Sequence, residues 1–123
     1  MTPEQTDIIK NVKKDTSAFI DSAIRDFGVW LHGCQSDDEF NEQYDNLIRT
    51  VSSILGDELE RINKAGVPRT VRRTLLSDTK KKNKAFLVGL SKKRAMWAGI
   101  FHAEKKASDD LSETLLELGL DDI

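Results

Sequence analysis

The chain has 123 residues, of which 38% are hydrophobic and 33% are charged, and its formal net charge at pH 7 is −2. This length is close to the commonest domain size and allows a hydrophobic core without disulfides or metal, so we expect one domain over residues 1–123. A lone cysteine, Cys34, excludes an internal disulfide framework, and no apolar run reaches the ~18 residues that span a bilayer.

The first predicted element is a long amphipathic helix. From Pro3 onwards, apolar residues recur with the 3.6-residue period of a helix and not with the 2-residue period of a strand. Thr2 is suited to cap the start of this helix, and Gly33 suits the left-handed residue that often follows a helix end. The pattern therefore predicts a helix over about residues 3–32.

A second long helix is predicted to follow directly. Ser36 and Glu39 have the spacing of a capping box, in which each side chain accepts a hydrogen bond from the backbone of the other residue. Gly66 suits the left-handed position after the helix end, and Pro68 cannot continue a regular helix. These signals predict a helix over about residues 37–65, antiparallel to the first because the turn between them is short.

The chain after Pro68 is predicted to form two helices before its acidic end. A short connecting helix is expected near residues 68–76. A third long helix is expected over about residues 79–107, with Ser77 or Thr79 as its cap.

The acidic C-terminal stretch completes the predicted fold. A short helix is expected near residues 109–118, with Ser108 as its cap and Gly119 at its end. Strand-like alternation is absent from the whole sequence, so we expect an all-α fold, an elongated bundle of three long helices and two short ones. Because such a thin bundle buries little surface per residue, a homodimer is one way to complete it.

Charge is segregated along the chain into three segments. Residues 1–63 carry 6 basic and 13 acidic side chains, residues 64–106 carry 13 basic and 2 acidic ones, and residues 107–123 carry 6 acidic and no basic ones. Local charge sets a surface potential, so the near-neutral total conceals a strongly basic region. We call residues 64–106 the basic segment.

The basic segment predicts a partner that carries many negative charges. Its positive excess is larger than pairing between neighbouring turns of one helix requires. Cations along one helix can contact successive phosphates, which favours largely sequence-independent binding of nucleic acid, either DNA or RNA. The residues predicted to make these contacts are Arg69, Arg72, Arg73, Lys80, Lys81, Lys82, Lys84, Lys92 and Lys106.

Other interpretations of the charge pattern stay open. The basic segment can lie against the acidic first and second helices, where surface ion pairs contribute about 0–1 kcal/mol each. The chain can instead be a protein-interaction module, an adaptor or an inhibitor of a macromolecular enzyme or regulator, that uses its segregated acidic and basic faces. The acidic C-terminal helix can dock in a partner's groove, fold back onto the basic segment, or seal one end of the bundle.

The aromatic residues of the basic segment are expected to be core residues. Phe86, Trp97 and Phe101 share the side of the third helix that a bundle must bury, so they are not expected to stack on bases. The same requirement argues against a membrane-surface role for this helix. A helix-turn-helix over residues 67–90 is not assigned, because its turn lacks a suitable glycine.

No motif for catalysis or cofactor binding is present in the sequence. His32 and Cys34 lie two residues apart, but His102 is remote in sequence and there is no second cysteine, so no metal site is expected. Glycine-rich phosphate loops, dinucleotide-binding turns and nucleophile elbows are also absent. We therefore expect a non-enzymatic protein with no cofactor and no small-molecule substrate. Because the N-terminus lacks the features of a secretory signal, we expect it to be cytoplasmic and not membrane-bound.

Overall fold

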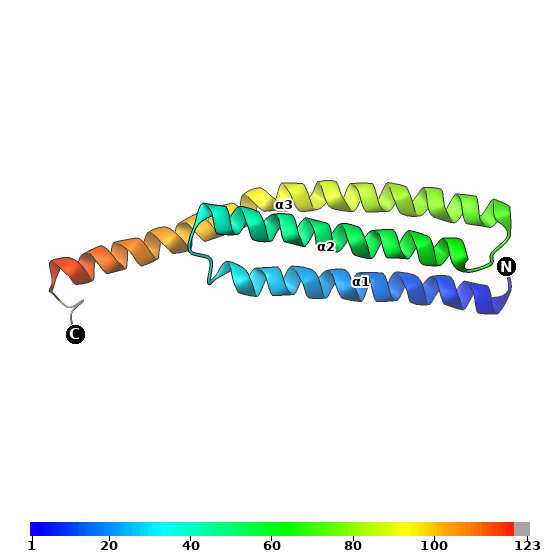
Figure 1. Ribbon diagram of the computed structural model, residues 1–123, viewed down its shortest axis with the longest axis horizontal. Helices are drawn as coiled ribbons and strands as arrows, with labels where there is room; N and C mark the ends of the chain where they lie inside the picture. The colour runs from blue at the N-terminus through cyan, green and yellow to red at the C-terminus, as the bar shows by residue number, and fades with distance from the viewer. Residues whose placement is uncertain (120–123) are drawn as a thin grey trace.

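The computed structural model describes residues 1–119, which form three α-helices: α1 (Pro3–Leu31), α2 (Asp37–Lys64) and α3 (Arg69–Glu117). The helices run antiparallel to one another in chain order, as an elongated bundle (Figure 1). No strand occurs within the described residues, so the all-α prediction is confirmed. None of the described helices combines the length and the hydrophobicity that crossing a membrane would require.

The starts of α1 and α2 follow from their capping residues. The Thr2 hydroxyl accepts a hydrogen bond from the Gln5 backbone N–H at 3.2 Å, and the Gln5 side chain accepts one from the Thr2 N–H at 3.0 Å. At α2, the Ser36 hydroxyl accepts from the Glu39 N–H at 3.2 Å, but the Glu39 carboxylate accepts from the Gln35 N–H instead of that of Ser36. Both predicted starts are confirmed, and only the first capping box is complete.

The ends of the first two helices differ from each other. Gly66 has a φ of 74°, as predicted, and its carbonyl accepts a hydrogen bond from the Gln5 side-chain amide at 2.9 Å, which ties the α2–α3 loop to the start of α1. Gly33 does not adopt the predicted left-handed conformation. Its N–H donates to the Trp30 carbonyl at 2.9 Å, so α1 ends in a tight turn that needs no positive φ.

The third helix corrects the predicted division of the chain after Pro68. Residues 69–117 form one continuous helix, where the sequence predicted two short helices and a long one between them. Ser77, Thr79 and Ser108 were expected to cap new helices, but serine and threonine also fit a helix interior at a cost of roughly 0.5 kcal/mol each. The helix stops where a left-handed residue follows it, at Gly119 with a φ of 69°.

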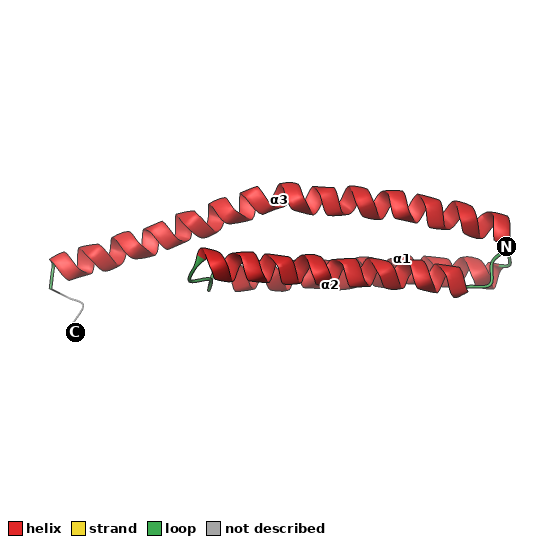
Figure 2. Cartoon of the chain, turned by 45° about the horizontal axis from the view of Figure 1, so that its top comes forward, coloured by secondary structure: helices red, strands yellow, loops and turns green. Residues whose placement is uncertain are grey.

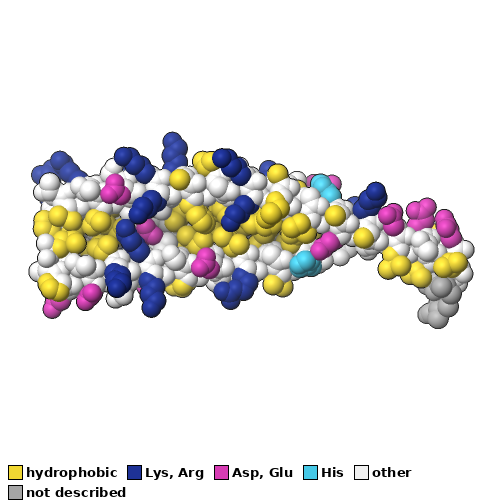
Figure 3. Space-filling view, turned by 180° about the vertical axis from the view of Figure 1, so that it is seen from behind, with side chains coloured by type: hydrophobic (Ala, Val, Ile, Leu, Met, Phe, Trp, Pro, Cys, Tyr) yellow, Lys and Arg dark blue, Asp and Glu magenta, His cyan; other side chains and the backbone are white. Residues whose placement is uncertain are grey.

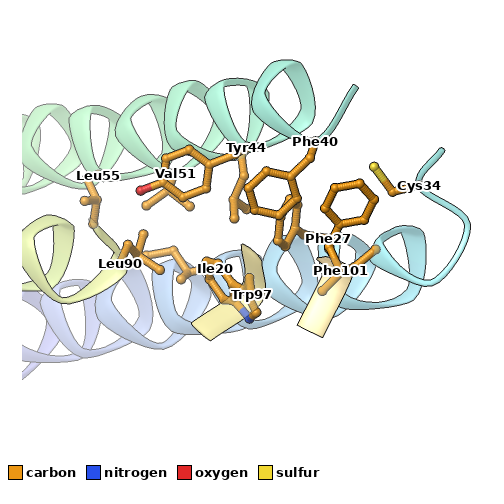
Figure 4. Close-up of a cluster of buried hydrophobic side chains, with 12 residues drawn as sticks. Ile20, Phe27, Cys34, Phe40, Tyr44, Val51, Leu55, Leu90, Trp97 and Phe101 are labelled. Atoms are coloured by element: carbon orange, nitrogen blue, oxygen red, sulfur yellow. The ribbon is translucent and has the colours of Figure 1, made fainter. Parts of the chain in front are cut away.

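The middle helix α2 lies between its neighbours and packs against both of them, whereas the backbones of α1 and α3 approach each other much less (Figure 1). Figure 2 shows the same three helices from another direction. An aromatic cluster joins all three helices near the α1–α2 loop, as Figure 4 shows. The Phe40 and Phe101 rings stack with their centroids 5.6 Å apart, and the centroids of the Phe27 and Trp97 rings are 5.0 Å apart. The prediction that Trp97 and Phe101 are core residues is therefore confirmed, and Phe86 is half-buried against the same cluster.

A smaller aliphatic cluster closes the opposite end of the bundle, where the α2–α3 loop lies. Its buried members are Ile9, Val12, Ile62 and Val67. Buried polar side chains lie outside both clusters: Thr16, Glu58 and Thr79, one from each helix. Thr16 donates to the Val12 carbonyl at 2.9 Å, but the Thr79 hydroxyl, on a residue only 2% exposed, has no hydrogen-bond partner within the described residues.

The C-terminal part of α3 extends beyond the end of the α1–α2 pair (Figures 1 and 2). We call residues 107–118 the overhang and residues 69–106 the packed part of α3. In the overhang, Leu111 is 60% exposed, and Leu116 and Leu118 are each 64% exposed. The overhang therefore does not seal the bundle. It also cannot fold back onto the basic segment, because both belong to one continuous helix.

Candidate nucleic-acid interface

The packed part of α3 carries all nine cationic residues that the sequence predicts to contact phosphates. They extend over about 56 Å of one helix, at 1.5 Å per residue from Arg69 to Lys106. Eight of the nine residues are exposed and only Arg72 is half-buried. A single rigid helix thus presents an extended row of cations, with no break near residue 78 where the sequence predicts a helix boundary.

Two other basic residues of the basic segment are already engaged. The Lys64 ammonium lies 2.7 Å from the Glu60 carboxylate, and this hydrogen bond raises the pKa of Lys64 and lowers the pKa of Glu60. The Arg94 guanidinium donates to the Asn41 side chain at 2.6 Å and lies 4.8 Å from the centre of the Tyr44 ring. The Lys64 pair lies within α2, whereas the Arg94 contacts link α3 to α2, so both side chains are already engaged within the chain.

None of the nine predicted residues forms an ion pair within the part of the chain that the structure describes. The close contacts between α3 and the neighbouring helix ends that pair a carboxylate with a basic side chain involve two histidines instead. The His102 ring lies 2.7 Å from the Asp37 carboxylate, and the His32 ring lies 2.7 Å from that of Glu104. Within residues 1–119, direct neutralisation of the nine predicted cations by the acidic helices is therefore not observed.

The nine residues lie in three different settings around α3. Lys80 and Lys84 line an apolar groove of about 540 Å³ between α2 and α3. Lys82 lies on the other side, in a groove that also contains the carboxylates of Asp21 and Glu58. Because nearby carboxylates lower the local positive potential, Lys82 is the least suited of these three lysines to bind an external anion.

The other six residues line none of the five grooves described on the bundle surface: the half-buried Arg72 and the exposed Arg69, Arg73, Lys81, Lys92 and Lys106. Of these, Arg73, Lys81, Lys92 and Lys106 have helical positions on the part of α3 that faces away from the core residues Leu90 and Trp97. Figure 3 shows Lys and Arg side chains over the length of the bundle, and acidic side chains on the overhang. This outer surface of α3 is the part most accessible to a large, rigid polyanion.

Burial of the aromatic residues limits the chemistry of this surface. Trp97 is 8% exposed and Phe101 is 1% exposed, so neither ring is available as a platform for a base. The surface can therefore offer phosphate contacts from guanidinium and ammonium groups, and these contacts carry no direct sequence information. Phe19, which the helical pattern of α1 places among apolar core positions, is instead 59% exposed in a groove between α1 and α2.

The sequence did not reveal the polar groove between α1 and α3. This groove is lined by Thr79, Glu58 and Asn83 among others, and neither the Thr79 hydroxyl nor the Asn83 amide nitrogen has a partner within the described residues. The available signal was the presence of Thr16, Glu58 and Thr79 at helical spacings from core positions. Such a signal is weak because threonine is common on both sides of a helix.

The histidines and the cysteine do not assemble into a metal centre within residues 1–119, where no group of three or more His, Cys, Asp or Glu side chains is arranged to hold an ion. The Cys34 thiol is buried and lies 3.4 Å from the Ser36 carbonyl oxygen. Burial raises the pKa of Cys34, which keeps the thiol protonated and poorly nucleophilic at neutral pH.

Comparison with known proteins does not identify a family for this chain. No protein-family model matches the sequence, no curated protein matches it, and no solved structure matches the fold.

Proposed function

We propose that this protein binds nucleic acid, DNA or RNA, through phosphate contacts from the packed part of α3, without catalysing a reaction. The observation that carries the proposal is the absence of ion pairs at all nine predicted cations within the described residues. Cations that form no ion pair remain available to attract an external anion, and Lys82, which lies near carboxylates, contributes least. Each phosphate contact releases condensed counterions, which would make the affinity strongly salt-dependent.

The shape of the surface supports contact with the backbone and not with base edges. The cations are spread along one long helix that is packed against α2, whereas a recognition helix reads base edges with a few residues near its N-terminus. Arginines such as Arg69 and Arg73 can form bidentate contacts with phosphate, and lysines act as mobile point charges. We therefore expect the binding to discriminate little between sequences.

The test is fluorescence anisotropy of labelled duplex DNA, single-stranded DNA and RNA, repeated across about 50–200 mM salt, where phosphate-driven binding changes most. The variant to compare with the wild type carries Arg73→Gln, Lys81→Gln, Lys92→Gln and Lys106→Gln, all outside the described grooves. We expect weaker binding to every ligand and a decrease of about three to four in the slope of log affinity against log salt.

A matched control variant distinguishes the effect of this particular surface on binding from the effect of net charge. Lys10→Gln, Lys14→Gln, Arg25→Gln and Arg49→Gln remove the same four charges from exposed positions on α1 and α2 that form no ion pair in the described structure. The control is expected to keep most of the affinity and the salt slope. Equal losses in both variants, or no binding by the wild type at the lowest salt, would contradict the proposal.

A second candidate function is a protein-interaction module, such as an adaptor or inhibitor. It is favoured by one specific observation, the groove of about 510 Å³ between α1 and α2 in which Phe19 is exposed beside Asp26. Exposed aromatic residues are typical of protein interfaces. Capture of a protein partner that is lost on Phe19→Ser, with no binding of nucleic acid, would favour this second function.

A further inference from the structure

The overhang of α3 is a helical segment with an apolar side that has no partner among the described residues of its own chain. Leu111, Leu115 and Leu118 recur at spacings of four and three residues, which places them on one side of the helix. The acidic residues gather on a different side, as the separate yellow and magenta areas of the overhang in Figure 3 show. An exposed leucine stripe on a helix is typical of a segment that docks in an apolar groove.

The groove between α2 and α3 has the chemistry that such a segment requires. Its apolar lining comes from Leu55 and Leu59 on α2 and from Leu87 and Val88 on α3. The α2 side is open at Gly56, where a Cβ atom added to the glycine would meet no atom within 4 Å. The groove is therefore an apolar surface that a row of leucines could cover.

Charge distinguishes this groove from the others on the bundle. Lys80 and Lys84 line it, and no carboxylate does. Each of the other four described grooves contains at least one Asp or Glu side chain in its lining. The overhang carries four acidic residues and no basic one, so its charge is complementary to this groove and is opposed by carboxylates in the others.

The lengths of the two surfaces also agree. The α3 side of the groove extends from Lys80 to Ser91, and the overhang has the same number of residues, so each is about 18 Å long at 1.5 Å per residue. The overhang cannot reach the groove of its own chain. Residues 91 and 109 are separated by about 27 Å of continuous helix that would have to break.

We propose that the overhang of one chain docks in the lysine-lined α2–α3 groove of a second copy of the same chain. Pairing of two overhangs through their leucines is the main alternative, but it brings two strongly acidic segments together and leaves the groove uncovered. Docking of overhang into groove is a head-to-tail contact between two different surfaces, so association leaves one free overhang and one free groove in each pair. This inference does not depend on the binding of nucleic acid.

The experiment is sedimentation velocity of the full chain over a wide range of protein concentration. Three variants are compared with the wild type, and each of them reverses the charge of two side chains. The groove variant carries Lys80→Glu and Lys84→Glu. The overhang variant carries Asp110→Lys and Glu117→Lys, two of the four acidic residues of the overhang. The control carries Lys10→Glu and Lys14→Glu, an exposed pair on α1 with the same spacing as the pair in the groove.

The wild type is expected to self-associate, and each of the first two variants is expected to raise the dissociation constant at least about tenfold. The control should associate as the wild type does. A fourth variant removes two leucines of the stripe by Leu111→Ser and Leu115→Ser. It should lose association without any change of net charge. Far-UV circular dichroism of each variant confirms that its helix content is retained.

A mixture of the groove variant and the overhang variant tests the head-to-tail geometry directly. The first keeps an intact overhang and the second keeps an intact groove, so together they should form a 1:1 complex although each alone is monomeric. A wild type that is monomeric at every concentration would overturn the inference. So would association that survives in the groove variant, since that result indicates pairing of overhangs, or equal losses in the control.

Discussion

Residues 69–106 and residues 107–118 belong to the same run of helix, yet only the first part is held by tertiary contacts. In the packed part, Leu90 and Phe101 are each 1% exposed and lie against α2 and α1. In the overhang, Leu111 and Leu118 are at least 60% exposed. Extending an existing helix requires no new nucleus, so the overhang can be helical without a surface to support it. Helical structure and tertiary packing are thus separable within one element.

The largest expected effect comes from removing an aromatic ring in the packed part. Phe101→Ala deletes a buried side chain that stacks on Phe40, so the free energy of unfolding should fall by about 3–5 kcal/mol. At a protein concentration low enough for the chain to be monomeric, Leu111→Ala in the overhang should change it by less than about 0.5 kcal/mol. Urea denaturation monitored by circular dichroism measures both. Similar losses for the two variants under these conditions would show that the overhang is packed against its own chain.

Proline substitution at two exposed alanines is expected to give the next largest difference. Ala85→Pro interrupts the packed part of α3, where it removes a backbone hydrogen bond and clashes with the preceding turn, at a cost of about 3 kcal/mol. Ala107→Pro interrupts the helix at the start of the overhang. It should reduce the helix content while the bundle unfolds at nearly the same urea concentration. A large loss of stability from Ala107→Pro would contradict the division of α3 into two parts.

The smallest effect is expected from two threonines with different surroundings. Thr79 is buried with an unpartnered hydroxyl, so Thr79→Val should raise the free energy of unfolding by about 1 kcal/mol. The Thr114 hydroxyl in the overhang donates to the Asp110 carbonyl at 2.9 Å in an exposed turn, and Thr114→Val should have an effect within about 0.5 kcal/mol. A destabilised Thr79→Val protein would indicate that ordered water satisfies the Thr79 hydroxyl.

The accuracy of the sequence predictions follows the range of the interactions involved. The starts of α1 and α2 were predicted because Thr2 and Ser36 bond to backbone groups only three residues away. The end of α2 was predicted because Gly66 meets a local conformational requirement. At Gly33 the same reasoning failed, since the chain turns there without a positive φ.

The predicted division of α3 failed for a related reason. Ser77, Thr79 and Ser108 are able to cap a helix, but capping residues do not force a helix to begin. Thr79 instead lies in the interior of the bundle, buried between clusters of apolar residues. Local sequence marked where a helix could start, and the packing of α3 along α2 favoured its continuation.

The candidate site was predictable in its composition and not in its surroundings. The nine cations and their concentration within one segment could be read from the charge pattern alone. Which of them lie beside carboxylates, as Lys82 does, and which line an apolar groove, as Lys80 and Lys84 do, depends on contacts between distant helices. The polar groove around Thr79 and Glu58 was missed for the same reason.

By itself, the sequence determined the helical class, the starts of the first two helices, the aromatic core of α3 and the separation of charge, because periodicity, capping and composition act over a few residues. Only the tertiary structure decided that the nine predicted cations form no ion pair among the described residues, that Phe19 is exposed, and that the overhang projects beyond the bundle. These features depend on how far each helix extends past its neighbours and which sides face one another, and no short stretch of sequence encodes either.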